Sequence, residues 1–339
     1  MTANLGSASR PLLSARARTM MSDGQLVVDT PEIELTFSGA SAAILASALD
    51  HLHGRCRVDE ISARLGLNEG ELKNTLQVLA DDEVVIDTDA AFDARSSTAF
   101  LDAYFAECRF LSNEIFAQPF WETFLSGRAE RNVVLGWGIE FYHFVDAANE
   151  HMAAAVAQCR DDPRTRAWLA RHYVEEHDHA SIFLDGLAGV GLDRELVRRA
   201  PPLPSTRGLI NYLTELATAD TIAYAGTFGV MQANREAMSR DAVERVFRLF
   251  GGQYPFATQL FDAFRQHALI DVDLKHQHLI LEKICEAHTE FSPHFVARPI
   301  NAARSVAEHF ILFFEGIHQY YGCAGAELPR RAFDVRLIR

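Results

Sequence analysis

The residues of this chain whose types and spacing suit chemistry are acids and histidines placed one helical turn apart. His172, Glu176 and His179 follow the spacing i, i+4, i+7, so in a helix they share one face with Trp168 and Phe183. A carboxylate and two imidazoles left unpaired among apolar side chains are costly, and a metal ion satisfies such groups well. For a single Glu-x-x-His, a buried hydrogen bond or a solvated polar face is the plainer alternative.

Two more segments carry such groups at helical spacing. Glu140 lies in a stretch rich in aromatic residues, and His267 and Asp271 are four residues apart in a later stretch. Helical bundles hold iron or manganese with carboxylates and histidines from facing helices, because carboxylate oxygens neutralise the ion and neutral imidazoles fix its geometry. Asp273 and His276 share the opposite face of the helix that carries His267 and Asp271. They offer an alternative pair, because that helix is apolar nearly all round.

The elements that must position these residues are almost all helical. From residue 96 to residue 325, Gly and Pro breakers separate long segments with helical periodicity, and no strand pattern appears. We predict a compact all-α bundle there, with single helices over 164–186 and 209–237. Residues 326–339 are expected to form a C-terminal tail.

Residues 25–95 have a different pattern, which predicts a small winged helix-turn-helix of the α+β kind. Two strands, three short helices and a return strand are expected at 26–28, 33–37, 42–53, 58–65, 68–79 and 84–87. Such a fold often binds DNA, but acids far outnumber bases in this segment, which argues against phosphate binding. A packing or dimerisation role is the plainer alternative. Residues 1–24 are expected to be a disordered tail.

Length and composition limit the possible functions. With 339 residues, 48% of them hydrophobic, the chain can build two domains and a large core. Its net charge of −14 argues against nucleic acid or an anionic membrane as a general partner. The cysteines form no Cys-x-x-Cys pair, which fits a reducing cytosol, and no apolar run reaches the ~20 residues of a membrane span. Phosphate-binding glycine motifs and a Gly-x-Ser-x-Gly elbow do not occur in the sequence.

The order Glu140, Glu176-x-x-His179, His267-x-x-x-Asp271 resembles the heme-oxygenase-like diiron oxidases and oxygenases. These are iron-containing redox enzymes related to thiaminase-II-like proteins and to pyrroloquinoline-quinone synthase. The resemblance spans residues 99–321 and implies that all five of these residues are metal ligands. The implied fold class is mainly α: a small N-terminal winged helix-turn-helix (α+β) followed by a heme-oxygenase-like all-α helical bundle.

Two positions depart from the pattern of that family. Where the family has a glutamate on its third ligand helix, this chain has Gln232, with Glu236 one turn later as a substitute. Where it has a further histidine after His-x-x-x-Asp, this chain has Leu274. Two nearby histidines are candidates for the missing role, His276, which we include among the predicted ligands, and His278. These departures leave one, two or no iron ions as open outcomes.

The resemblance implies a non-heme iron oxidase or oxygenase of specialised, natural-product metabolism, with Fe(II) (one or two ions) as cofactor and O2 as co-substrate. The expected substrate is amino-acid-, amine-, peptide- or fatty-acid-like. A cofactor-free oxidase of the pyrroloquinoline-quinone-synthase type and a non-catalytic peptide- or partner-binding protein stay open, because residues 25–95 resemble peptide-binding modules of ribosomal-peptide-modifying enzymes. We expect a small-molecule or peptide substrate, no nucleic acid and no membrane contact, with a homodimer as an option. The expected location is cytoplasmic.

Overall fold

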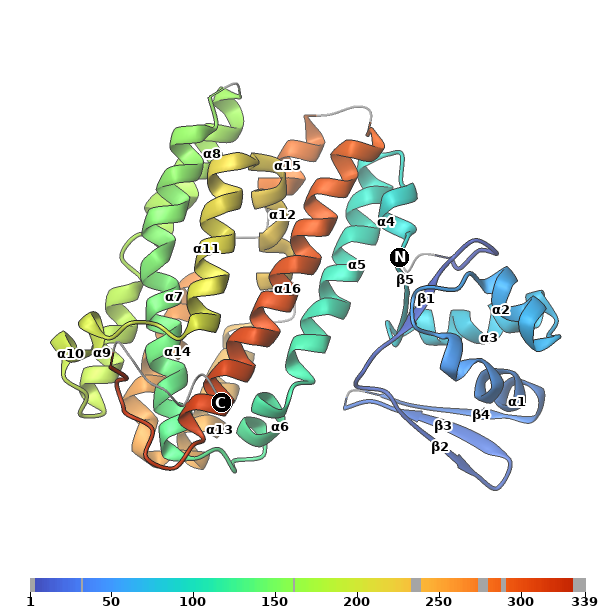
Figure 1. Cartoon of the computed structure of the whole chain (residues 1–339), viewed down its shortest axis with the longest axis horizontal. Coiled ribbons are helices and arrows are strands. Elements are labelled where there is room, and N and C mark those ends of the chain that lie inside the picture. Colours follow the sequence, from blue (N-terminus) through green and yellow to red (C-terminus); the bar gives the residue numbers. More distant parts are fainter. Residues whose placement is uncertain are drawn as a thin grey trace. The chain divides into compact units, whose positions relative to one another are not determined.

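The fold was analysed in a computed structural model, which describes residues 4–31, 33–160, 162–232, 239–273, 280–287 and 291–331. Contacts group the chain into a first unit, residues 1–117 with 285–300, and a second unit, residues 118–284 with 301–339. Among the described residues, helices make up most of both units, and the strands lie in the first (Figure 1). The expected fold class, mainly α with a small N-terminal β part, is confirmed. The contacts place the helix that follows residue 96 with the first unit, whereas the sequence suggested a boundary at residue 95.

The strands of the first unit form two small antiparallel sheets. One sheet has the order β2-β3-β4 and the other pairs β1 with β5. Their bounds are β1 Pro11–Leu13, β2 Arg18–Ser22, β3 Gln25–Asp29, β4 Glu34–Ser38 and β5 Val85–Asp87. The sequence predicted a disordered tail over residues 1–24, but β1 and β2 lie there. All five residues of β2 are exposed, so backbone pairing with β3 holds this strand and no burial pattern announces it.

Helices cover the core of the first unit. They are α1 Gly39–Ala48, η1 Leu49–His51, α2 Val58–Leu65, α3 Glu69–Asp81, α4 Ala90–Asp93 and α5 Ser97–Phe116. Leu45, Ile61 and Leu72 are fully buried among them. The predicted cap of α3 is present, since the Asn68 side chain accepts a hydrogen bond from the amide of Glu71 at 3.1 Å. The helices follow the predicted order, while β5 pairs with the unpredicted β1, so the winged-helix assignment stays a prediction.

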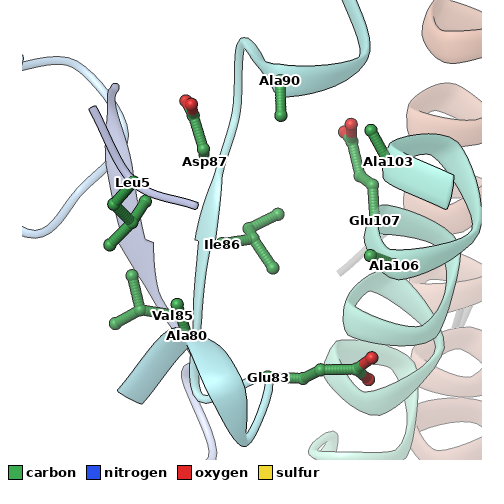
Figure 2. Close-up of a pocket in the computed structure, with 10 residues that line it drawn as sticks. All are labelled: Leu5, Ala80, Glu83, Val85, Ile86, Asp87, Ala90, Ala103, Ala106 and Glu107. Atoms are coloured by element: carbon green, nitrogen blue, oxygen red, sulfur yellow. The ribbon is translucent and has the colours of Figure 1, made fainter. Parts of the chain in front are cut away.

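A narrow pocket lies between β5 and α5 in the first unit (Figure 2). Ile86 points into it from the strand, and Ala103 and Ala106 form the facing wall. Its cavity volume of about 30 Å³ holds water molecules but no organic substrate. This pocket is therefore too small to be a substrate site.

The second unit is a bundle of helices around α7 (Figure 1). Its elements are α6 Pro119–Leu125, α7 Arg131–Gln158, α8 Pro163–Glu176, α9 Ala180–Gly189, α10 Arg194–Arg199, α11 Pro204–Ala219, α12 Thr221–Met231, α13 Arg240–Gln253, η3 Pro255–Ala257, α14 Thr258–Asp273, α15 Ile280–Glu286 and α16 Pro293–Tyr321. The last two also contribute residues to the first unit. Helix α7 packs against α8, α9, α11 and α12, and α14 packs against α9 and α13. Aromatic rings fill the interior, as in the stack of Trp137 on Phe264 at 4.3 Å between centroids.

Both predicted single helices are divided in the structure. The segment 209–237 is interrupted at Asp220, whose side chain accepts hydrogen bonds from the amides of Ile222 and Ala223 and so caps the start of α12. Residues 233–238 lie outside the described residues. The segment 164–186 is interrupted between Glu176 and Ala180, at the residues expected to bind metal.

None of the described helices is both long enough and apolar enough to cross a lipid bilayer.

Candidate metal centre

Four of the predicted ligands come together in the second unit. Glu176, His179, His267 and Asp271 each offer a nitrogen or oxygen atom, and these atoms all lie within 4.8 Å of one another. Glu176 ends α8, His179 precedes α9, and the other two lie one turn apart on α14. Residues almost a hundred positions apart in the sequence therefore share one centre.

The turn between α8 and α9 gives Glu176 and His179 their placement. The amide of His179 donates to the carbonyl of Glu176 at 3.2 Å, and the amide of Ile182 donates to the carbonyl of His179 at 3.1 Å. Both bonds join residues three apart, so this turn is tighter than an α-helix. No local signal predicts it, because no Gly or Pro occurs between the two helices.

Close packing of α9 on α14 brings the two halves of the centre together. Gly186 of α9 lies so near α14 that an added Cβ would stand 2.6 Å from Cβ of Ala263 and 3.0 Å from the carbonyl oxygen of Gln259. Only glycine permits this approach. The imidazole rings of His179 and His267 consequently meet edge to face, with 4.8 Å between centroids.

Hydrogen bonding and charge tune the Glu176–His179 pair. Nδ1 of His179 donates to Oε2 of Glu176 at 2.8 Å. Burial raises the pKa of Glu176, but the hydrogen bond from His179 and the charges of His172, His179 and His267 outweigh burial and lower that pKa to about 2. The hydrogen bond to Glu176 in turn raises the pKa of His179 against the effect of its burial. The carboxylate is therefore held in its ionised, metal-binding form.

His172 supports Glu176 from the preceding turn of α8. Its Nε2 lies 3.7 Å from Oε1 of Glu176, the oxygen that His179 does not use. Its ring also packs on Phe228 of α12, with 5.0 Å between centroids. His172 thus stands beside the carboxylate, in the position that residues behind metal ligands commonly take.

Asp271 and His267 form the second pair. Oδ2 of Asp271 lies 3.5 Å from Nδ1 of His267. The other oxygen, Oδ1, is buried and makes no hydrogen bond within the described part of the chain. A buried carboxylate oxygen without a donor is costly, and a cation beside it removes that cost.

Glu140 lies outside the cluster that four other predicted ligands form. Its carboxylate is fully buried and accepts hydrogen bonds from the amide of Leu203 at 2.9 Å and the hydroxyls of Thr206 at 2.6 Å and Tyr321 at 2.9 Å. It is absent from the cluster of four, and its contacts join α7 to α11 and α16. Burial raises its pKa, and the three donors oppose that rise.

The register of α7 explains the position of Glu140. The next residue, Phe141, contacts Phe183 at 5.0 Å and Phe264 at 4.9 Å between ring centroids, and Phe183 contacts His267 at 5.1 Å. Neighbouring residues of a helix point about 100° apart. Helix α7 therefore faces the centre with aromatic rings, and Glu140 points to one side.

The other predicted participants are only partly described. Gln232 follows α12, and its buried Oε1 has no hydrogen-bond partner among the described residues. The remaining candidates Glu236, Leu274, His276 and His278 lie outside the described residues. Thr206 and Tyr321 were not anticipated, since nothing in their local sequence signals a contact with Glu140.

The donor set fits iron. Two imidazole nitrogens and two carboxylate oxygens suit Fe(II), and the two negative charges balance one divalent ion. No sulfur takes part in this cluster, which distinguishes it from thiolate sites for zinc or copper(I). Oδ1 of Asp271, which makes no hydrogen bond within the described part of the chain, is available as a ligand to such an ion.

Comparison with solved structures finds the same kind of bundle. A domain of unknown function with a heme oxygenase-like fold from Shewanella denitrificans is 20% identical, with a TM-score of 0.57, and the match covers 69% of this chain and 98% of that one. A TenA homolog from Pseudomonas syringae pv. tomato is 13% identical, with a TM-score of 0.43, over 64% of this chain and 92% of that one. The first similarity shows the heme-oxygenase-like fold that the sequence predicted.

Comparison with protein families gives the assignment. No curated protein matches this sequence. The model of a family described as "iron-containing redox enzyme" matches residues 135–309, more than half of the chain, and this range contains all four clustered residues. The chain therefore belongs to the iron-containing redox enzyme family.

Proposed function

We propose that this protein is a non-heme iron oxidase or oxygenase that uses O2. The observation that carries the proposal is the convergence of Glu176, His179, His267 and Asp271 in a bundle of the iron-containing redox family. The site's acids and imidazoles match what iron requires, and their partly buried positions limit the access of water. Family membership supports the redox class, and the donor set supports iron.

The protein's own residues have distinct tasks in this proposal. The carboxylates of Glu176 and Asp271 supply the negative charge, and His179 and His267 supply neutral nitrogen ligands. His172 holds the carboxylate of Glu176 in place. Bound Fe(II) would supply the electrons with which O2 is reduced.

An aromatic wall limits access of water to the centre. Phe183 packs directly on His267, and Phe141 and Phe264 pack on Phe183 at centroid distances of 5.0 and 4.9 Å. The low polarity of these rings strengthens the electrostatic attraction between ligands and ion. The organic substrate is proposed to be amino-acid-, amine-, peptide- or fatty-acid-like, as the family resemblance implies.

Anaerobic Fe(II) titration of the metal-free protein, followed by measurement of O2 uptake, tests the proposal. We expect the parent protein to bind iron and then consume O2. Glu176→Gln and Asp271→Asn each remove a ligand charge and should weaken iron binding at least about tenfold. The matched control is Glu175→Gln, because Glu175 pairs with Arg171 at 2.9 Å outside the cluster.

Two results would contradict the proposal. Iron binding by Glu176→Gln with the affinity of the parent would show that the cluster is not the site. Undiminished O2 consumption after exhaustive chelation would instead favour a cofactor-free oxidase. The cofactor-free oxidase is the second candidate because Gln232 is uncharged where the family has a glutamate.

A further inference from the structure

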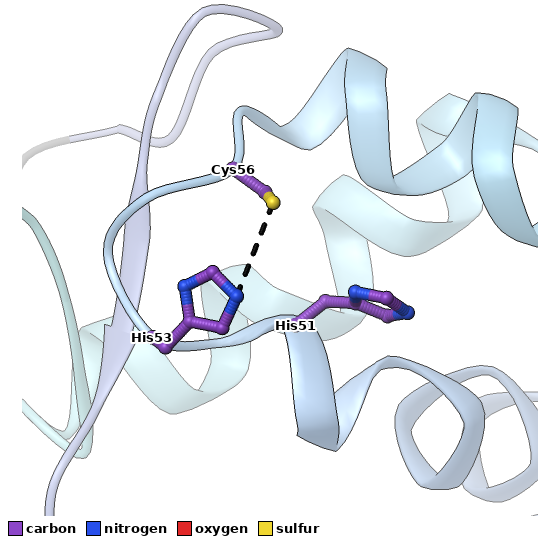
Figure 3. A group of neighbouring side chains, drawn as sticks. All are labelled: His51, His53 and Cys56. Carbon is purple, nitrogen blue, oxygen red and sulfur yellow. Dashed lines mark hydrogen bonds between the residues drawn. The ribbon is translucent and has the colours of Figure 1, made fainter.

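A second group of metal-binding side chains lies in the first unit, outside the centre described above. His51, His53 and Cys56 each offer a ligand atom, and the three atoms lie within 4.8 Å of one another. Figure 3 shows the imidazole of His53 facing the sulfur of Cys56, with 4.0 Å between Nε2 and Sγ, and the His51 ring beside them extending to the other side. Cys56 is buried, and His53 is exposed at the surface.

Backbone contacts fix the loop that carries these residues. The amide of Leu13 donates to the carbonyl of Leu52 at 2.8 Å, and the amide of Gly54 donates to the carbonyl of Pro11 at 2.9 Å. Gly54 has a φ of +72°, a conformation that favours glycine and turns the chain between His53 and Cys56. The loop is therefore held on β1 with the three side chains already gathered.

We propose that His51, His53 and Cys56 form a second metal site, which takes a divalent ion of the zinc type. Two imidazole nitrogens and one thiolate sulfur make a mixed donor set, and such nitrogen and sulfur ligands select zinc-like ions over Mg(II) or Ca(II). In a tetrahedral zinc site, nitrogen and sulfur ligands stand about 3.6 Å apart. The observed 4.0 Å between His53 and Cys56 is close to this spacing.

Metal binding requires only small changes in the surrounding contacts. The amide of Arg55 donates to Nδ1 of His53 over a long, exposed 3.3 Å. Binding through Nε2 moves the ring proton to Nδ1 and breaks this contact, which water then replaces. A guanidinium nitrogen of Arg64 donates to Sγ of Cys56 at 3.2 Å, and N–H donors of this kind accompany metal-bound thiolates. Three protein ligands leave the fourth position for water.

Sulfur distinguishes this site from the iron centre, which has none. Titration of metal-free, full-length protein with Co(II) under reducing conditions is the test. Thiolate coordination produces a sulfur-to-cobalt charge-transfer band in the near ultraviolet, which imidazoles and carboxylates cannot give. We expect that band in the parent protein, its loss in Cys56→Ser, and its displacement by Zn(II).

Matched variants separate this site from other binding. Cys323→Ser replaces an exposed cysteine and should leave the band unchanged, as should Glu176→Gln, which affects only the iron centre. His53→Ala, at an exposed position, and His51→Ala should each weaken Co(II) binding at least about tenfold. These two variants decide the matter if Cys56→Ser does not fold.

The proposal is overturned by either of two results. One is the absence of the charge-transfer band in the parent protein. The other is a band that keeps its strength in Cys56→Ser, or an affinity for Co(II) that stays unchanged in both histidine variants. The iron proposal is unaffected by each outcome, because the two sites share no residue.

Discussion

Replacing Tyr321 by Phe tests whether Glu140 is a structural carboxylate and not a metal ligand. The Tyr321 hydroxyl donates to Oε1 of Glu140 at 2.9 Å, while Leu203 and Thr206 donate to Oε2. Phenylalanine keeps the ring, which lies so close to Gly136 that an added Cβ there would stand 2.3 Å from it. The substitution therefore removes one donor and leaves the packing unchanged.

The loss of stability expected in Tyr321→Phe follows from the burial of Glu140. Glu140 is 0% exposed, so water does not replace the missing hydroxyl. A hydrogen bond to a charged group contributes about 1.5–3 kcal/mol, and a buried acceptor without a donor is similarly costly. We expect the free energy of unfolding to fall by about 1.5–3 kcal/mol, which lowers the melting temperature by roughly 3–10 °C in a domain of this size. Urea unfolding of the metal-free protein, followed by circular dichroism, measures the change.

Iron affinity provides the second arm of this experiment. If Glu140 only joins α7 to α11 and α16, Tyr321→Phe should bind Fe(II) as the parent does. A variant as stable as the parent would show that the hydrogen bond contributes nothing. A variant of normal stability with tenfold weaker iron binding would show that Glu140 is a ligand and that its assignment as a structural carboxylate is wrong.

Three further outcomes are expected. Gly186→Ala should destabilise the protein by about 1–3 kcal/mol, because its Cβ would overlap Ala263. In Gly208→Ala the added Cβ meets open space in α11, so this variant should stabilise the protein by about 0.5–1 kcal/mol. Thermal melting of both variants measures the two changes. Burial lowers the pKa of His151 from 6.5 to about 4, so on acidification the unfolded chain takes up the proton first. The free energy of unfolding should therefore fall by up to about 3 kcal/mol between pH 6.5 and pH 4. In His151→Gln this dependence of the unfolding free energy on pH should be weaker. The pKa of His179 is raised, so Fe(II) must displace a proton to bind. The apparent affinity for iron should therefore rise with pH through and beyond 6.5. Calorimetry in buffers of different ionisation enthalpy measures the released proton.

Local spacing was enough to predict the two pairs of proposed metal ligands. Glu176 and His179 are three residues apart, and His267 and Asp271 are four apart, so any helical conformation sets each pair on one face. Each pair is in contact in the structure, at 2.8 and 3.5 Å. The break between α8 and α9 did not separate the first pair, because its tight turn keeps a helical course.

The direction in which Glu140 points could not be predicted from local spacing. Helix α7 is apolar nearly all round, with Gly136 to Glu140 all buried, so no polar face indicates which residue points at the centre. A rotation of one residue exchanges Glu140 for Phe141. That rotation is set by partners far along the chain, Thr206 and Tyr321, which local sequence does not reveal.

Two features of the first unit were also not predicted from the sequence. The exposed strand β2 has no alternating burial, so the hydrophobic pattern that identifies strands is missing from it. The group of His51, His53 and Cys56 did leave a signal, the spacing His-x-His-x-x-Cys. The lack of a Cys-x-x-Cys pair did not exclude such a group, since mixed nitrogen and sulfur sites need only one cysteine.

Convergence of the two pairs of proposed ligands depends on helix packing more than on these residues themselves. Glycine at position 186 lets α9 approach α14, and this approach sets the 4.8 Å between the rings of His179 and His267. An alanine Cβ at position 186 would stand 2.6 Å from Cβ of Ala263, and relief of this overlap moves the helices by more than the roughly 0.2 Å that a metal–ligand distance tolerates. Iron affinity should therefore fall in Gly186→Ala although every ligand is retained, because the site is a property of the packed bundle and not of its motifs.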